Sequence, residues 1–423
     1  MTVGEVSRDT ATEDAGSESS RLRPRGSNQV GMRQFNERVV LQAIRMHGSM
    51  PKADIARLTH LTAQTVQIII ARLQADHLVR RLEPVRGRVG QPSVPMALDP
   101  DGAFAVGIKI GRRSMDMLLV DFTGRARERV SLSYSFPDPQ ALFSEIETRL
   151  RELRVSLPLK LRGRLTGVGV AAPLSLEGWQ TLLGVAPEQA AQWAGIDIRE
   201  RIQAMTDLPV EFVKDTAAAC VAELVAGRGR SIRSFLYIFV DTFIGGGLVI
   251  DSHLRAGPSG NAGAVGSMAL AQAPRSKGSP QGSPPPPQLL SVASLYRLES
   301  MFREKGLDST AVADGRAFEP PWRKLTQAWL GESARAIALA IQSAACLVDV
   351  EGVIVDGSFD RAVLDALLGG LEAALNAYSW EGVARPALLA GTIGSDARAI
   401  GGALLPLYAN FAPDRDLFLK LSS

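Results

Sequence analysis

The sequence predicts an α/β protein in two unequal parts, a small basic helical module followed by a larger two-lobed body. Its 423 residues, 46% apolar and 22% charged, suit a globular protein but exceed what one compact core usually holds. Helical apolar spacing recurs between residues 33 and 73, whereas strands and helices alternate from Phe104 onward. The net charge of +3 is uneven, because residues 21–95 carry thirteen Lys or Arg and four acids. This concentration of positive charge is typical of a surface that meets a phosphate backbone.

The range Lys52–Leu73 predicts two short helices joined by a tight turn. Ile55 and Leu58 recur at helical spacing in the first helix. Thr62 precedes the second helix and can accept a hydrogen bond from its free backbone N–H groups. The second helix carries an i, i+3, i+4, i+7 apolar stripe made of Val66, Ile69, Ile70 and Leu73. This pattern favours a helix-turn-helix.

The face of the second helix opposite its apolar stripe contains no acid. Amide, methyl and guanidinium groups stand there instead, and these suit base edges in a DNA major groove. The alternative is an ordinary three-helix subdomain whose outer face happens to lack acids. We favour DNA binding, with candidate residues Thr62, Gln64, Thr65, Gln67, Ile68 and Arg72.

The residues around these two helices predict the rest of a winged helix-turn-helix over residues 31–99. A first helix is expected at Arg33–His47, with Ser49 and Pro51 opening the next helix. Residues 1–30 are polar and lack periodicity, which predicts a disordered tail.

A hairpin is predicted after the helix-turn-helix. It comprises a strand at 78–82, a loop with sequence RGRVGQP, and a returning strand at 94–98. Its prolines at 92 and 95 favour an edge position over a central one. Such a hairpin is a wing, and Arg86, Arg88 and Gln91 are its candidate DNA contacts, with the arginines suited to a narrow minor groove. The alternative is a basic loop at a domain edge.

The body, residues 103–423, shows the same order of predicted strands and helices twice. Three meander strands are expected at 105–110, 116–122 and 129–136, then a helix at 141–155, strands at 165–173 and 208–213, and a helix at 216–226. A hairpin at 235–240 and 245–251, helices over 290–350, a strand at 350–357 and two helical segments flanking 384–394 follow. Residues 271–288 predict a flexible loop with four successive prolines. The repetition predicts two lobes with a cleft between them.

The two cysteines, Cys220 and Cys346, lie in apolar helical contexts and have no CxxC spacing. We therefore expect buried thiols in a reducing compartment. Neither a signal-peptide pattern at the start nor an apolar run of membrane-spanning length is present, which predicts a cytoplasmic protein without membrane contact.

Six motifs together resemble the ROK family, which contains sugar kinases and sugar-responsive repressors. They are GIKIG (107–111), GVGVAAP (167–173), VKDTAAA (213–219), DTFIGGG (241–247), GNAGAVG (260–266) and GTIGSDARAIGGAL (391–404). The resemblance implies a winged helix-turn-helix followed by a two-lobed, actin-like sugar-kinase fold, as in the repressor branch of the family. It covers nearly everything from Arg33 to Phe411.

Several positions depart from the kinase pattern that this resemblance implies. Lys109 stands where ROK kinases carry an acid, and Arg112 replaces a small residue. Asp241 and Phe243 occupy a turn that is Gly-Thr-Gly in kinases, where backbone N–H groups approach nucleotide phosphates. Asp215 matches the family's catalytic base. We expect no enzymatic activity, and hence no catalytic residue and no cofactor.

The family's sugar and zinc motifs are also altered. Ala264 and Ser267 stand in place of Glu and His, and residues 268–290 contain no Cys or His, so we expect no metal. The candidate effector-binding residues are Lys109, Arg112, Lys214, Asp215 and Asn261, which suit a sugar or an anionic metabolite. That these groups lie on the surface or pair with acids is an equally open interpretation.

The sequence therefore predicts a transcriptional regulator, most simply a repressor of carbohydrate or central carbon metabolism genes. It is expected to bind double-stranded DNA at a palindromic operator as a homodimer or higher homo-oligomer, and to respond to a small molecule. One alternative is an ATP-dependent carbohydrate kinase with an appended DNA-binding domain. Another is a regulator that has lost its ligand and answers to a partner protein.

Overall fold

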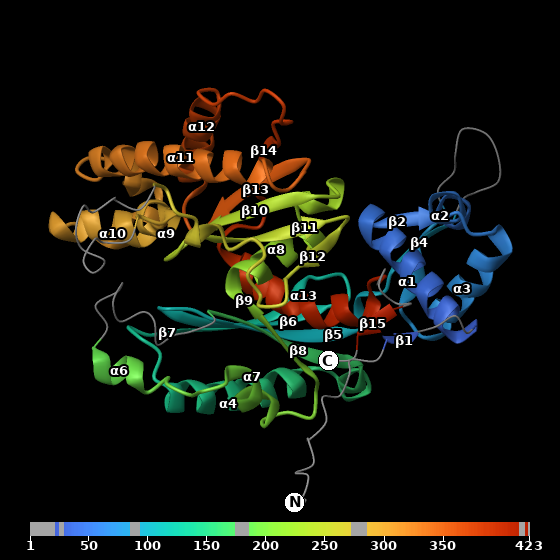
Figure 1. Cartoon of the computed structure of the whole chain (residues 1–423). Coiled ribbons are helices and arrows are strands. Elements are labelled where there is room, and N and C mark those ends of the chain that lie inside the picture. Colours follow the sequence, from blue (N-terminus) through green and yellow to red (C-terminus); the bar gives the residue numbers. More distant parts are fainter. Residues whose placement is uncertain are drawn as a thin grey trace, which may run out of the picture.

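The computed structural model describes residues 22–24, 29–84, 94–173, 186–271, 286–413 and 419–421 (Figure 1). The predicted hairpin loop at 85–93, most of the predicted Pro-rich loop (272–285) and most of the amino-terminal tail (1–21 and 25–28) lie outside this range. The outermost described strands, β1 (Leu22–Pro24) and β15 (Leu419–Leu421), pair antiparallel with each other.

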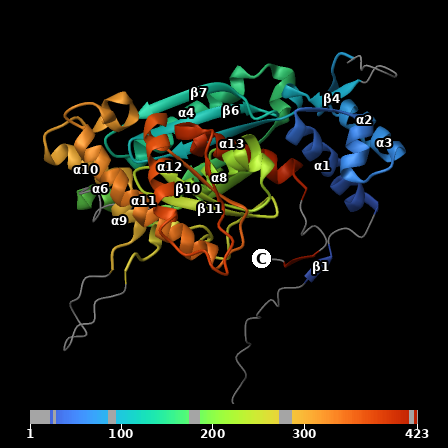
Figure 2. The ribbon, with the colours of Figure 1, turned by 90° about the horizontal axis from the view of Figure 1, so that it is seen from above.

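The amino-terminal module consists of three helices and a three-stranded sheet. Its helices are α1 (Gln29–His47), α2 (Lys52–Thr59) and α3 (Ala63–Ala75). Its strands are β2 (Ser49–Pro51), β3 (Val79–Arg81) and β4 (Pro95–Leu98), in the order β2-β4-β3. Both views of the ribbon place α1 next to the body and α3 farther from it (Figures 1 and 2).

Three predictions for this module were wrong. The segment Ser49–Pro51 is a strand paired with β4, so Ser49 does not open α2, whereas Pro51 is both the last residue of that strand and the N-cap residue of α2. The strand β4 is central, not at an edge, and tolerates Pro95 because this proline is its first residue, where the carbonyl still accepts from the Leu82 N–H at 2.9 Å. Leu58 is 48% exposed, since the short helix α2 directs only Ile55 fully into the core.

The body contains two five-stranded sheets with the same topology, which confirms the predicted repeat. The first has the order β7-β6-β5-β8-β9 and the second β12-β11-β10-β13-β14. In each, a three-strand antiparallel meander is extended by two parallel strands. The first sheet comprises β5 (Phe104–Ile110), β6 (Ser114–Asp121), β7 (Ala126–Ser133), β8 (Leu165–Ala172) and β9 (Val210–Lys214). The second comprises β10 (Phe235–Val240), β11 (Gly245–Ile250), β12 (His253–Arg255), β13 (Gly352–Gly357) and β14 (Ala387–Ala390).

The helices form the outer layers and one central layer (Figure 1). The first sheet carries α4 (Pro139–Ser156), α6 (Pro187–Ala191) and α7 (Ile198–Gln203) on its outer side. The second carries α9 (Leu289–Ala293), α10 (Leu295–Glu304), α11 (Arg323–Ala345) and α12 (Arg361–Leu375). Between the sheets, α8 (Asp215–Ala226) packs against α13 (Ala397–Phe411). The two helices approach closely because Gly401 has no side chain, and a Cβ there would overlap the carbonyl oxygen of Ala218.

The amino-terminal module shares a hydrophobic core with the body. We call each five-stranded sheet with its outer helices a lobe. One continuous cluster joins Val40 and Ile44 of α1 to Phe122 of the first lobe and Leu407 of α13. Phe122 also meets Phe411 edge to face, with ring centroids 4.8 Å apart. No break in packing therefore separates the two parts of the chain at residues 99–103.

The cysteine prediction holds for one residue and is wrong for the other. Cys220 is buried in α8, whereas Cys346 is exposed because it follows the last turn of α11. Among the described residues, no helix combines the length and apolar character needed to cross a bilayer. The same residues contain no group of three or more His, Cys, Asp or Glu side chains placed to hold a metal ion.

Candidate functional site

The predicted cap and apolar stripe of α3 are both confirmed. The Thr62 hydroxyl accepts from the backbone N–H of Thr65 at 3.1 Å and lies 2.8 Å from the Thr65 hydroxyl. All four stripe residues, Val66, Ile69, Ile70 and Leu73, are buried. His60, in the left-handed conformation at φ 55°, ends α2 and allows the tight turn into α3.

The opposite face of α3 is exposed. Its side chains include Gln64, Gln67, Ile68 and Arg72, and Ile68 is 47% exposed. Thr65 is half-buried. Since α3 lies on the far side of α1 from the body, this face is not covered by any part of the chain that the structure describes (Figure 2).

An acid from another helix approaches this face. The Arg72 guanidinium lies 3.6 Å from the carboxylate of Glu37 in α1, which also lies 3.9 Å from Arg33. Sequence reasoning missed Glu37 because it considered the charges of α3 alone. The helical spacing of Arg33 and Glu37 in α1 is a sequence signal, but nothing local connects Glu37 with Arg72.

The hairpin residues Arg86, Arg88 and Gln91 lie outside the described residues. The described strands β3 and β4 pair antiparallel, as the predicted hairpin requires. Arg80 and Arg81 of β3 are exposed at its base.

A second candidate site is a cavity of about 240 Å³ between the two lobes. It is lined by the β5–β6 turn, the end of β8, the start of α8, the β10–β11 turn and α13. Its charged residues are Arg112, Lys214, Asp215, Asp241 and Arg398. Three of the five residues proposed from the sequence for an effector, Arg112, Lys214 and Asp215, are therefore brought together here.

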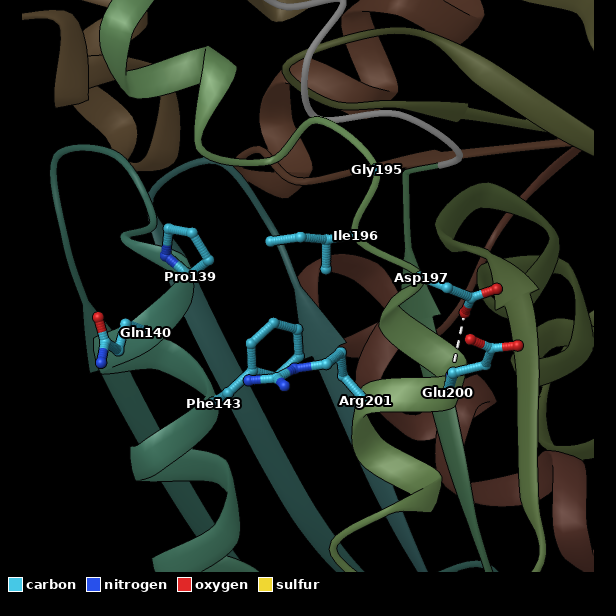
Figure 3. Close-up of a pocket in the computed structure, with 8 residues that line it drawn as sticks. All are labelled: Pro139, Gln140, Phe143, Gly195, Ile196, Asp197, Glu200 and Arg201. Atoms are coloured by element: carbon cyan, nitrogen blue, oxygen red, sulfur yellow. Dashed lines mark hydrogen bonds between the residues drawn. The ribbon is translucent and has the colours of Figure 1, made fainter.

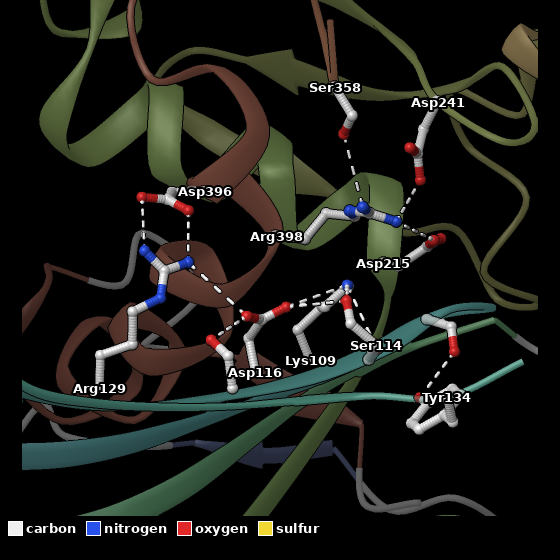
Figure 4. Close-up of polar contacts among 12 residues, drawn as sticks. Lys109, Ser114, Asp116, Arg129, Tyr134, Asp215, Asp241, Ser358, Asp396 and Arg398 are labelled. Carbon is white, nitrogen blue, oxygen red and sulfur yellow. Dashed lines mark hydrogen bonds and ion pairs between the residues drawn. The ribbon is translucent and has the colours of Figure 1, made fainter. Parts of the chain in front are cut away.

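Arg398 is central to this cavity, and sequence reasoning missed it. Its guanidinium lies 3.7 Å from Asp215 and forms a closer ion pair with Asp241, while the Ser358 hydroxyl is 3.4 Å away (Figure 4). Burial raises the pKa of Asp215, the neighbouring Asp241 raises it further, and Arg398 opposes both effects. Asp215 also accepts from the Thr216 N–H at 2.8 Å. The carboxylates of the cavity are thus already paired with a cation from α13.

Lys109 and Asn261 do not line the cavity. Lys109 is buried and donates to the Ser114 hydroxyl at 2.6 Å and to Asp116 at 3.0 Å (Figure 4). Burial lowers the pKa of Lys109, and the charge of Arg398 lowers it further. Asn261 is exposed on the loop after β12. For Lys109, the interpretation that the cation pairs with an acid is correct.

Arg112 joins the two lobes. It lies 3.1 Å from Glu299 of α10 in the second lobe, and Arg113 binds the same carboxylate at 2.8 Å. We call this three-residue contact the lobe clasp. Arg112 therefore both lines the cavity and forms part of the clasp.

The profile of the ROK family matches residues 105–408, nearly three quarters of the sequence. The chain belongs to the ROK family. Among its relatives, the DNA-binding transcriptional repressor Mlc of Escherichia coli (strain K12) is 23% identical over 54% of this chain and 56% of its own length. The xylose repressor of Bacillus subtilis (strain 168) is 22% identical over 58% and 62%. The bifunctional enzyme NanE/NanK of Brucella melitensis is 29% identical over 51% of this chain and 38% of its own length. The chain thus matches less than two thirds of the length of each.

Solved structures support the same fold. A ROK family transcriptional regulator, described as a homolog of the E. coli MLC protein, is 19% identical and aligns over 90% of this chain and 98% of its own, with a TM-score of 0.63. A ROK family glucokinase from Streptomyces griseus, in complex with glucose and AMPPNP, is 20% identical over 72% and 99%, with a TM-score of 0.56. ROK relatives thus include both regulators and kinases.

In this ROK chain, the β10–β11 turn is hydrogen-bonded to α9 and α10. The Ile244 N–H donates to the Ser294 hydroxyl at 2.9 Å. The carbonyl oxygens of Asp241 and Thr242 accept from the first backbone N–H groups of α10. Phe243 lines the cavity, and its ring centroid lies 6.2 Å from that of Tyr296. A phosphate group would therefore find an occupied N–H, an aromatic side chain and a carboxylate in this turn.

A further hollow of about 540 Å³ lies on the outer layer of the first lobe, between α4 and α7 (Figure 3). Its polar groups serve local structure: the Asp197 carboxylate accepts from the Glu200 N–H at 3.0 Å and caps α7. The Arg201 guanidinium lies 5.3 Å from the centroid of the Phe143 ring. Asp197 and Arg201 thus have partners within the first lobe.

Proposed function

We propose that this ROK protein is a sequence-specific DNA-binding transcriptional regulator, a repressor of carbohydrate or central carbon metabolism genes. The observation that carries the proposal is the uncovered outer face of α3, on which the helix itself carries no acid. Gln64 and Ile68 on that face match an adenine edge and a thymine methyl group. The repressors among the relatives favour the same function.

In this proposal, residues 31–99 are a winged helix-turn-helix and residues 103–423 form the effector-sensing and oligomerisation domain. Helix α3 enters the major groove with the exposed residues of its outer face. The hairpin residues Arg86, Arg88 and Gln91 contact the adjacent minor groove or backbone. A homodimer places two copies of α3 on a palindromic operator.

The cavity between the lobes is the proposed effector site. At about 240 Å³ it is smaller than the roughly 300–1,000 Å³ of drug-sized ligand sites, which suits a sugar or a similarly small metabolite. Three buried polar atoms of its lining have no protein partner: Arg112 Nε, Thr216 Oγ1 and Arg398 Nε. Ligand oxygens would satisfy such atoms, since an unpaired buried polar group costs about 1–3 kcal/mol.

The lobe clasp supplies the proposed link between ligand and DNA. A ligand that binds Arg112 competes with Glu299, so it favours a different arrangement of the lobes. The amino-terminal module shares its core with the first lobe and α13, and therefore follows their movement. A coupling of about 1–3 kcal/mol is typical of such effects.

The second candidate is an ATP-dependent carbohydrate kinase with an appended DNA-binding domain. The presence of Asp215 at the start of α8, in the cavity, favours it, as do the kinases among the relatives. The bonded β10–β11 turn and the pairing of Asp215 with Arg398 favour the regulator instead. We therefore propose that the protein is not an enzyme.

Genome-wide mapping of bound sites, followed by binding of the purified full chain to the mapped duplexes, tests the regulator. Salt-dependent, sequence-selective binding near carbohydrate genes supports it. Incubation with ATP, Mg²⁺ and a panel of sugars tests the kinase, with Asp215→Ala as the control. Steady ADP release that Asp215→Ala abolishes, without selective DNA binding, would reverse the assignment.

A further inference from the structure

A third cavity, of about 460 Å³, lies at the junction between the amino-terminal module and the body. We call it the junction pocket. Module residues from the end of α1, β2, β3 and β4 line one part of it, and the β6–β7 turn with residue 230 lines the other. Four arginines contribute to the lining, Arg45, Arg80, Arg125 and Arg230, together with the hydroxyl-bearing Ser49 and Thr123. None of the lining residues is acidic.

The four arginines have no carboxylate partner among the described residues. Arg230 donates to the carbonyl oxygens of Arg45, at 2.9 Å, and Met46. Both carbonyls belong to the last turn of α1, where they lack helical partners. The Arg45 guanidinium lies 5.1 Å from the centroid of the Phe122 ring. Burial lowers the pKa of Arg45 to about 10, with a further contribution from Arg230.

Acids that are close in sequence are engaged elsewhere. Asp99 accepts from the Asp101 N–H at 3.1 Å. Asp101 and Asp121 both pair with Arg127, at 3.2 and 2.7 Å. The Asp121 carboxylate also accepts from the hydroxyl of Thr123 at 2.6 Å. None of these three carboxylates forms an ion pair with the guanidinium groups of Arg45, Arg80, Arg125 or Arg230.

We propose that the junction pocket binds a small phosphate-bearing metabolite that bridges the module and the body. Arginine suits phosphate because its planar fork donates two parallel hydrogen bonds to phosphate oxygens. Here the guanidinium groups come from α1, β3, the β6–β7 turn and the segment after α8, so one ligand contacts both parts of the chain. The volume is within the range of small-molecule sites.

The position of the pocket favours a free metabolite over the backbone of bound DNA. Figure 2 shows α3 on the side of the module away from the body. The junction pocket, by contrast, is lined by residues of both the module and the body. A metabolite bound there adds contacts between the module and the body beside their shared core, and so affects how the module presents α3. This regulatory consequence rests on the proposed DNA-binding function, but the binding of phosphate does not.

The test measures ligand binding to the full chain without DNA, by calorimetry and thermal shift. The probes are inorganic phosphate, glucose 6-phosphate and fructose 1,6-bisphosphate, with glucose as the neutral probe at matched ionic strength. The variant Arg80→Gln/Arg125→Gln changes two exposed side chains of the pocket. The variant Arg255→Gln/Arg335→Gln removes the same charge from exposed positions on the second lobe.

At least one phosphorylated probe is expected to bind the wild type and to raise its Tm by several degrees. Arg80→Gln/Arg125→Gln should weaken the Kd at least tenfold, while the control double variant keeps the wild-type value. Equal weakening in both double variants, or no binding of any phosphorylated probe, overturns the proposal.

Further outcomes distinguish a metabolite in the junction pocket from a ligand between the lobes and from bound DNA. The first outcome is that glucose binds as tightly as glucose 6-phosphate and that Arg80→Gln/Arg125→Gln leaves both affinities unchanged. The ligand would then bind between the lobes, and the proposal would be overturned. The second outcome is that this variant loses affinity for duplex DNA in the absence of added phosphate, while the wild type binds no metabolite. The arginines would then contact DNA phosphates, and the proposal would be overturned. Metabolite binding without any DNA binding leaves the pocket established and removes the proposed function alone.

Discussion

The guanidinium of Arg72 lies 3.6 Å from the carboxylate of Glu37, and both side chains retain access to solvent. This ion pair joins α1 to the outer face of α3, where DNA is proposed to bind. A surface pair of this kind contributes only about 0–1 kcal/mol to stability. Its larger effect is to engage a cation that is otherwise available to DNA.

Replacement of Glu37 by Gln is expected to strengthen DNA binding up to about fivefold, because it frees Arg72 and removes a negative charge near the DNA. A plot of the logarithm of the DNA association constant against the logarithm of salt concentration should become steeper by about one unit, as expected for one more phosphate contact. Titration of a mapped duplex at several salt concentrations measures both effects. Glu147→Gln, which breaks the exposed pair with Arg151 on α4, is the matched control. Unchanged or weaker binding would show that Arg72 does not meet DNA.

The variant Gln64→Ala is expected to weaken binding to a cognate duplex by about 1–3 kcal/mol and to relax base preference at one position of each half-site. The reason is the loss of an amide that pairs with a base edge, since Gln64 is exposed in the first turn of α3. Gln74→Ala, at the other end of the helix, should change little. Competition binding with single-base variants of the operator measures the preference. A uniform loss on all sequences would contradict base reading by Gln64.

The stability of the protein should depend on pH through Asp215. Burial and the neighbouring Asp241 raise its pKa in the folded protein above the ordinary value of 3.8. The folded state therefore favours the protonated form, and this contribution is complete below pH of about 4 and is lost as pH rises through the folded pKa. Asp215→Asn removes the titration, so its stability relative to wild type should improve from pH 4 to pH 7. Urea unfolding at several pH values measures the trend.

Asp207→Asn provides a control of opposite sign. Its hydrogen bond with Arg154 holds the pKa of Asp207 below the ordinary value. That stabilisation is present above pH of about 4 and is lost as pH falls, so the relative stability of this variant should worsen from pH 3 to pH 6. If the stabilities of the two variants relative to wild type changed with pH in the same direction, the environment of Asp215 would have been misassigned.

The two thiols should differ sharply in reactivity. Cys346 is exposed after the last turn of α11, whereas burial raises the pKa of Cys220 and excludes reagents. One thiol per chain is therefore expected to react with a disulfide reagent under native conditions, and two in denaturant. Cys346→Ser should abolish the native reaction. A residual fast thiol in that variant would indicate that α8 opens readily.

The sequence predicted those helices and strands whose apolar periodicity is visible within their own residues. The α3 stripe, the Thr62 cap and the repeated meanders each depend on residues within a few turns or strands of one another, and the structure confirms them. The strand Ser49–Pro51 was missed because three residues carry no periodicity and pair with a partner more than forty positions away. Pro95 was taken to favour an edge strand, which was wrong, because as the first residue of the central strand β4 it removes no hydrogen bond from the interior of that strand.

The charged contacts were harder to predict because each joins distant parts of the chain. Glu37 meets Arg72 across two helices, and Glu299 reaches Arg112 and Arg113 from the other lobe. Arg398 meets Asp241 only because α13 packs between the sheets. A sequence shows which side chains are cationic, whereas their neutralisation depends on the tertiary fold.

The core that is shared by α1, Phe122 and α13 has a consequence for how the protein melts. Separating the module would expose Val40, Ile44 and Leu407 to water, with a large loss of apolar burial. The module and the first lobe should therefore denature as one cooperative unit, giving a single calorimetric endotherm for that part of the chain. A fragment ending near residue 99 would expose the apolar surface of α1 to water and should precipitate.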